Sequence, residues 1–209
     1  MVWSRLVLQK LVAQEISEFR TAEIPDLEEQ HPDAKYWLAN HFLNSALRAQ
    51  YGEGFRQAAL GYLRRSTHAY EAHLDARKRT LNYLDNTDPQ FANLVPYYRA
   101  VAAWENFAMQ SAMALDLFKW MNNGDGAFRK LDGSILYRIY TIANHVKHAA
   151  SCIESGQCTT DDVLPLWLTE VGLKSFDNIE VTYLETALVF DELAELANVL
   201  QDPLTFAKH

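Results

Sequence analysis

Apolar side chains recur every three or four residues along most of the chain, which is the spacing that one face of an α-helix requires. This pattern predicts five helices before the C-terminal region, over residues 2–19, 32–51, 54–84, 96–121 and 134–154. Clusters of Gly, Pro and Asn mark the turns between them. The helix that begins at Pro96 is apolar on all sides, so we expect it to be central.

The segment Leu164–Phe176 breaks the helical pattern because it contains Pro165, Gly172 and strand-prone residues at irregular spacing. We expect a small irregular or hairpin excursion there. Thr182 and Glu185 then have the spacing of a capping box, which predicts that the last helix begins near Tyr183. The pattern as a whole predicts an all-α, up-and-down helical bundle that forms a single domain over residues 1–209.

Composition narrows the function classes. The chain has 209 residues, of which 49% are hydrophobic, enough to bury a substantial core. Its net charge of −8 argues against a broad surface for duplex DNA, although a small local basic site remains compatible with it. Charged residues interrupt the apolar stretches near the N-terminus, and there are only two cysteines. We therefore expect a cytoplasmic protein without a membrane span.

The segment 134–154 contains the most informative residues. At about 100° per residue, its isoleucines form one stripe that faces the core, and a neighbouring stripe carries Arg138, Thr141, His145, His148 and Cys152. Arg138 and His145 lie two turns apart, about 10 Å along the axis. A guanidinium binds phosphate and an imidazole transfers protons near neutral pH, so this pair suits phosphodiester chemistry.

This segment resembles the HEPN (higher eukaryotes and prokaryotes nucleotide-binding) family, whose signature is an Arg followed by a His after four to six residues. Here six residues, Ile139 to Asn144, separate Arg138 from His145, and Asn144–His148 is similar to the Asn-x-x-Lys-His run of some family members. The resemblance covers roughly residues 90–200. It implies a helical bundle that acts as a metal-independent ribonuclease, or binds nucleotides, in a toxin–antitoxin or defence system.

The resemblance also implies roles for single residues. Arg138 would bind phosphate, and His145 would shuttle a proton or orient the attacking ribose hydroxyl, across a homodimer cleft and without a cofactor. The expected partners are RNA or a nucleotide, a second copy of the chain, and an antitoxin or other protein. Candidate supporting residues are Thr141, Asn144, Lys147, His148 and Glu105.

A zinc site is an alternative use of the same stripe. His145, His148 and Cys152 lie at i, i+3 and i+7, and Cys158 follows a Gly-containing turn that could return it to them. Two nitrogen and two sulfur ligands suit tetrahedral zinc. The spacing matches no common zinc module, however, so we expect less than one zinc per chain.

A non-catalytic interaction module is the other alternative. Glu105 and Asp116 share one face of the central helix, where a buried carboxylate needs a cation, and Arg138 is the candidate. A structural ion pair would account for all three residues without catalysis. The surroundings of Arg138 separate the hypotheses, since an open cleft favours the ribonuclease and burial against an acid favours the module.

Overall fold

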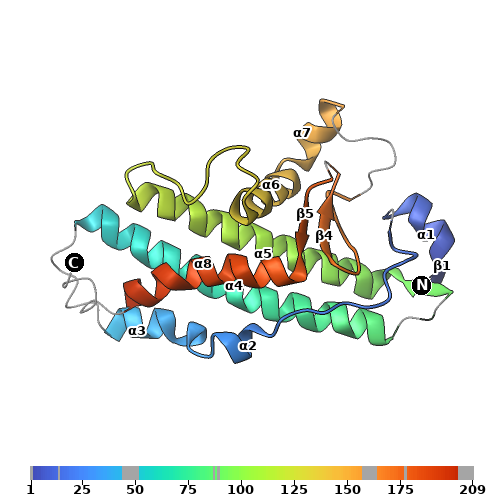
Figure 1. The fold of residues 1–209 in the computed structure, drawn as a ribbon, viewed down its shortest axis with the longest axis horizontal. Helices are drawn as coiled ribbons and strands as arrows, with labels where there is room; N and C mark the ends of the chain where they lie inside the picture. Colours follow the sequence, from blue (N-terminus) through green and yellow to red (C-terminus); the bar gives the residue numbers. More distant parts are fainter. Residues whose placement is uncertain are drawn as a thin grey trace.

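Two long antiparallel helices, α4 (Glu53–Asp85) and α5 (Leu94–Met121), form the centre of the molecule (Figure 1). The computed structural model describes residues 2–13, 15–43, 52–86, 88, 90–156, 164–176 and 178–201. Helix α8 (Tyr183–Gln201) packs against both long helices, and α6 (Ile135–Lys147) packs against α5. The expectation of a largely helical protein is confirmed.

Helix α5 is central, as its apolar surface predicts. It packs against α4, α6, α8 and a strand of the C-terminal sheet, and its Trp104 and Phe107 are fully buried. Gly61 lets α4 approach it closely, because a Cβ at that position would lie 3.1 Å from the side chain of Leu117. Trp104 also donates from Nε1 to Thr80 Oγ1 at 3.0 Å, which ties the two helices together.

The N-terminal helix predicted over residues 2–19 is much shorter. Strand β1 (Val2–Ser4) pairs antiparallel with β2 (Phe91–Asn93), and α1 covers only Arg5–Leu11. The guanidinium of Arg5 is buried and donates to the backbone carbonyls of Ile16, Phe19 and Asp88. Residues 15–18 form turns instead of a helix, and the apolar side chains of Ile16 and Phe19 there are fully buried, so the apolar pattern reflects packing.

The second predicted helix is divided into short pieces. Helix α2 (Leu27–Gln30) precedes the 3₁₀ turn η1 (Ala34–Tyr36) and α3 (Trp37–Leu43). Trp37 stacks on Phe190 of α8 and donates to Asn198, which fixes α3 to the last helix. The predicted end at Tyr51 lies outside the described residues.

The predicted helix 134–154 is broken at His148, which has φ −111° and ψ 24°. Residues beyond it form a separate short helix, α7 (Ala149–Glu154). Ile139 and Ile142 lie in the core as expected, but Ile153, which the pattern assigned to the same stripe, is exposed. The change of direction at His148 accounts for this difference.

The predicted excursion before the last helix is a three-stranded antiparallel sheet of β3 (Leu166–Leu168), β4 (Gly172–Ser175) and β5 (Glu180–Thr182), with β4 in the middle. A side chain at Gly172 would collide with the backbone of Val181 and Thr182, so the close strand approach needs glycine. Helix α8 begins at Tyr183, as the capping box predicts. The two small sheets correct the all-α class to a mostly helical one.

A membrane-spanning segment was not expected. In the part of the chain that the structure describes, no helix combines the length and the apolar character needed to cross a bilayer.

Candidate functional site

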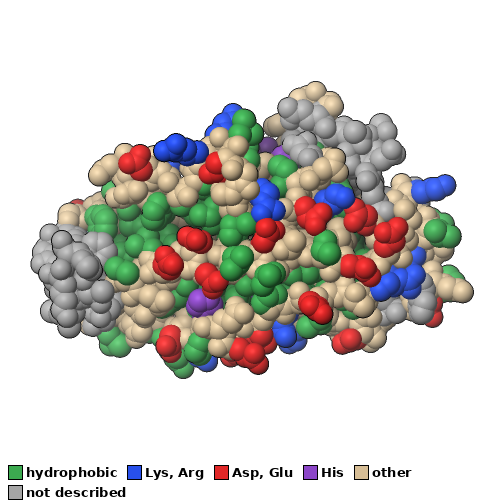
Figure 2. All heavy atoms as spheres, in the orientation of Figure 1, with side chains coloured by type: hydrophobic (Ala, Val, Ile, Leu, Met, Phe, Trp, Pro, Cys, Tyr) green, Lys and Arg blue, Asp and Glu red, His purple; other side chains and the backbone are tan. Residues whose placement is uncertain are grey.

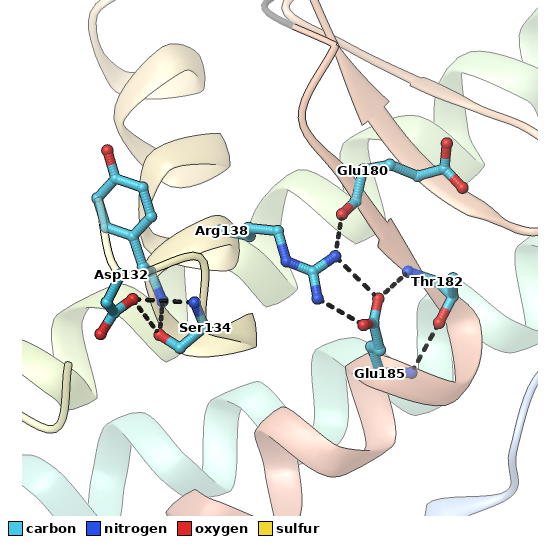
Figure 3. Close-up of polar contacts among 7 residues, drawn as sticks. Asp132, Ser134, Arg138, Glu180, Thr182 and Glu185 are labelled. Carbon is cyan, nitrogen blue, oxygen red and sulfur yellow. Dashed lines mark hydrogen bonds and ion pairs between the residues drawn. The ribbon is translucent and has the colours of Figure 1, made fainter. Parts of the chain in front are cut away.

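Arg138 reaches from α6 to the start of α8, where it forms a two-pronged ion pair with Glu185 (Figure 3). Its Nη2 donates to Glu185 Oε1 at 2.5 Å, and its Nη1 donates to Oε2 at 3.1 Å. Nη1 also donates to the backbone carbonyl of Glu180 in β5. Only 27% of the Arg138 side chain and 23% of the Glu185 side chain is exposed. The guanidinium therefore joins α6, β5 and α8.

Glu185 also completes the capping box of α8. Its Oε2 accepts from the Thr182 backbone N–H at 2.9 Å, and its own N–H donates to Thr182 Oγ1 at 3.1 Å. Burial alone would raise the pKa of Glu185, but the hydrogen bonds from Arg138 and Thr182 together lower it below its usual value. The ionised carboxylate is thus held at the helix N-terminus by both partners.

His145 lies on the same side of α6 but against another strand. Its ring stacks on Phe176 with centroids 4.4 Å apart, and its Nδ1 lies 3.2 Å from Ser175 Oγ of β4. Only 9% of the residue is exposed, and Ser175 is fully buried. Arg138 and His145 therefore both contact the C-terminal sheet, each with partners of its own.

The acids that the sequence suggested for Arg138 have other surroundings. Asp116 is exposed and accepts a hydrogen bond from the Tyr140 hydroxyl at 2.9 Å. Glu105 is half-buried, and that burial raises the pKa of its carboxyl group. The expected pairing of Arg138 with either acid is wrong, since Glu185 takes that place.

The remaining candidate residues on α6 have no contact with Arg138 or His145 among the side-chain hydrogen bonds of the described residues. Thr141 is partly buried and donates from its hydroxyl to the Tyr137 carbonyl, one helical turn earlier. Asn144 is partly buried, while Lys147 and His148 are exposed at the end of α6. Among the candidate residues on the described part of α6, Arg138 and His145 are the two whose side chains form hydrogen bonds with the C-terminal sheet.

The zinc alternative stays a prediction. No group of three His, Cys, Asp or Glu side chains is arranged for a metal ion within the described part of the chain. Cys158 and the side chain of Cys152 lie outside the described residues, so two of the four proposed ligands are not placed.

An apolar groove beside α8 is a feature that the sequence reasoning missed. The groove has a volume of about 250 Å³. Two glutamates, Glu192 and Glu195, are among its lining residues. Its other walls are Tyr62, Leu115, Phe118, Ala127, Leu136, Leu193 and Leu196. Figure 2 shows a recessed area of hydrophobic side chains on this part of the surface, with acidic side chains along its lower border. The walls come from α4, α5, α6, α8 and the loop before α6, so no local pattern could reveal it.

Comparison with known proteins supplies no family for the chain. No family model, no curated protein and no solved structure matches it. The resemblance to HEPN domains thus rests on the residues around Arg138 and His145, and function is argued from the geometry of the described residues.

Proposed function

We propose that this protein is a non-catalytic helical interaction module that binds a basic amphipathic helix of a partner protein in the groove beside α8. The groove carries the proposal because it combines apolar walls with Glu192 and Glu195. Amphipathic helices bind by inserting apolar side chains spaced three or four residues apart into such grooves. Lysines or arginines at the border of the bound helix would then meet the two glutamates.

The surface of α8 extends the groove in the direction of its N-terminus. Leu184 and Leu188 are exposed and precede Glu192 by two turns and one turn, so the three side chains follow one stripe along the helix. Contiguous exposed apolar surface with a polar border is typical of interaction sites. A partner helix lying along α8 would cover both leucines and enter the groove at Leu196.

The contacts that Arg138 and His145 already make within the chain favour an interaction module over a catalytic site. A guanidinium that already binds two carboxylate oxygens and a carbonyl has few donors left for phosphate. His145, stacked on Phe176 and near Ser175, is largely shielded from solvent. Both residues serve to hold the C-terminal sheet and α8 in place, which in turn positions the groove.

Metal-independent RNA cleavage, with a nucleotide or RNA as ligand, is the second candidate. It is favoured by one observation, that Arg138 and His145, the two residues to which the family resemblance gives roles, both extend from α6 towards the C-terminal sheet. In this mechanism an RNA phosphate would displace Glu185 from Arg138. The cost of that displacement is the reason that we rank it second.

Two designed peptides test the interaction module. Both are amphipathic helices with the same leucine positions, and one carries lysines where the other carries glutamates. We expect the full chain to bind the lysine peptide in a fluorescence anisotropy titration and to bind the glutamate peptide at least tenfold more weakly, since charge complementarity sets the preference. Glu192→Lys combined with Glu195→Lys should reverse that order.

Controls make the result decisive. Glu18→Lys with Glu23→Lys changes the net charge equally at positions away from the groove, and this variant should keep the preference for the lysine peptide. Leu196→Asp should weaken binding of the lysine peptide because it places a charge among the apolar walls. Binding that is indifferent to both groove changes, or absent for both peptides, would remove the proposal.

A further inference from the structure

A second pocket lies beneath the loop that joins α5 to α6, and it is polar where the groove is apolar. It has a volume of about 560 Å³, and three basic side chains line it, Lys119 from the last turn of α5 and Arg129 and Lys130 from the loop. Figure 2 shows basic side chains along the upper edge of the molecule, over this loop. Such a concentration is notable in a chain with a net charge of −8.

The basic side chains of this pocket are available to a ligand. Within the described part of the chain, none of the three has an ion pair or a side-chain hydrogen bond, although two carboxylates line the same pocket. One of these, Asp116, accepts from the Tyr140 hydroxyl, and the other is Asp125. Three cations and two acids thus line the pocket, and Arg129 also interacts electrostatically with Asp132 beside it, so an anion bound in the pocket would meet a lining of net positive charge.

The loop is held in a defined shape by Asp132. Its carboxylate accepts from the Arg129 backbone N–H at 2.7 Å and from the backbone N–H and hydroxyl of Ser134, the N-cap residue of α6 (Figure 3 shows the contacts with Ser134). Leu131, between these residues, has φ +64°, a conformation that costs a bulky side chain about 1 to 2 kcal/mol. Strained backbone of this kind persists where surrounding contacts enforce it, and it clusters at ligand sites.

We propose that this pocket binds a small organic phosphate, with the phosphate group on Lys119, Arg129 and Lys130. Phosphate offers the doubly negative charge and multiple acceptor oxygens that three cations prefer. The pocket is larger than a bare phosphate needs and falls within the range of small-molecule sites. Leu115 and Phe128 supply the apolar wall for the organic part.

Three probes separate the two parts of the proposed ligand. Phenyl phosphate carries both the charged and the apolar part, inorganic phosphate carries only the charged part, and phenol carries only the apolar part. In NMR titrations of the full chain we expect saturable binding of phenyl phosphate with a Kd at or below about 1 mM. Inorganic phosphate should bind more weakly, and phenol should show no saturation. The amide signals of Gly124 and Gly126, which line the pocket, should move while those of Gly52 and Gly172 remain in place.

Variants test the charge argument in both directions. Lys119→Gln, Arg129→Gln and Lys130→Gln should each weaken phenyl phosphate binding by about two- to fivefold, as exposed ion pairs do. Asp125→Asn should strengthen it about twofold by removing a repulsive charge. The triple Gln variant should bind more than about tenfold more weakly than Lys10→Gln/Arg64→Gln/Lys78→Gln, which has the same net charge but exposed changes elsewhere.

Two results would overturn the site. One is the absence of saturable phenyl phosphate binding to the wild-type chain, and the other is equal binding by the two triple variants. Movement of amide signals all over the surface, without saturation at Gly124 and Gly126, would indicate nonspecific association and would also exclude the site. These outcomes do not depend on the groove, so this proposal and the interaction module can fail separately.

Discussion

Arg138 and Glu185 are 47 residues apart in the chain, yet both nitrogens of the guanidinium fork donate to both oxygens of the carboxylate. The same carboxylate accepts from the backbone of Thr182 and so caps α8. One acidic side chain thereby determines where the last helix begins and how that helix is attached to α6.

Loss of the Arg138–Glu185 pair should destabilise the fold. We expect Arg138→Met to lower the free energy of unfolding by about 2 to 3 kcal/mol, because Glu185 is left partly buried without its cation. Glu185→Gln should cost less, about 1 to 2 kcal/mol, since glutamine still completes a capping box. In urea denaturation, the double-mutant cycle should give a coupling energy of at least about 1 kcal/mol.

The pair Asp75–Arg79 on α4 is the matched control. Its side chains are 46% and 40% exposed, and it is a pair of helical neighbours four residues apart. Asp75→Asn with Arg79→Met should give a coupling energy below about 0.5 kcal/mol. Equal coupling in both cycles would contradict a structural role for Arg138 beyond that of an ordinary surface ion pair.

The buried His73 should make the fold sensitive to mild acid. Burial lowers its pKa from 6.5 to about 3. Thr186 Oγ1 donates to the Tyr183 carbonyl, so its lone pair accepts the Nε2–H of His73 at 3.0 Å, which identifies the neutral tautomer. Because the folded pKa is depressed, this stability is fully present above about pH 6.5 and is lost as pH falls towards 3.

His73→Phe tests this pH dependence. In the wild-type chain, protonation linked to His73 should lower the free energy of unfolding by about 2 kcal/mol between pH 7 and pH 5. Phenylalanine suits the neighbouring rings of Trp104 and Phe107, and Thr186 keeps its own donor bond. The variant should therefore lose about 2 kcal/mol less than the wild type between pH 7 and 5 in urea unfolding. An identical loss in both proteins would show that His73 does not control it.

The strained Leu131 should be improvable. Its side chain is 76% exposed, so replacing it sacrifices little burial, while glycine adopts φ +64° without steric cost. We expect Leu131→Gly to raise the free energy of unfolding by about 0.5 to 1 kcal/mol. Leu6→Gly, at an exposed position inside α1, should instead lower it by about 1 kcal/mol. Destabilisation by Leu131→Gly would mean that the leucine side chain has contacts of its own to maintain.

Local signals explain which parts of the fold were predictable. The start of α8 depends on two residues three positions apart, Thr182 and Glu185, so the sequence suffices to locate it. Helices α4 and α5 follow from apolar periodicity over many turns. The prediction for the N-terminal region is wrong because β1 pairs with a strand near residue 92 and the Arg5 guanidinium binds the carbonyl of Asp88, 83 residues along the chain. Periodicity contains no information about such distant partners.

The candidate site shows the same limit. The helical spacing correctly placed Arg138 and His145 on one side of α6, but it could not supply the partners that decide their roles. The sequence identifies Glu185 only as a capping residue, although its carboxylate also pairs with Arg138. The helix breaks at His148 without a Gly or Pro nearby, so the sequence contains no helix-breaking residue that would predict the break.

RNA cleavage is the test that separates the two functional candidates. We expect the wild-type chain, free of copurified protein and in the presence of EDTA, to cut a mixed single-stranded RNA pool no faster than Arg138→Met or His145→Gln. The reason is that Glu185 and the Glu180 carbonyl already accept three hydrogen bonds from Arg138, while Phe176 shields His145. Glutamine is preferred to alanine at His145 because alanine would open a cavity beside Phe176.

The oligomeric state must be measured together with RNA cleavage, because the mechanism implied by the family resemblance places the active-site cleft between two copies of the chain. Sedimentation at the assay concentration would establish whether a dimer is present, and circular dichroism would confirm that both variants are folded. Cleavage by a wild-type dimer that exceeds both variants would show that RNA displaces Glu185 from Arg138. The interaction module would then give way to a ribonuclease in which the Arg138–Glu185 ion pair holds the resting state.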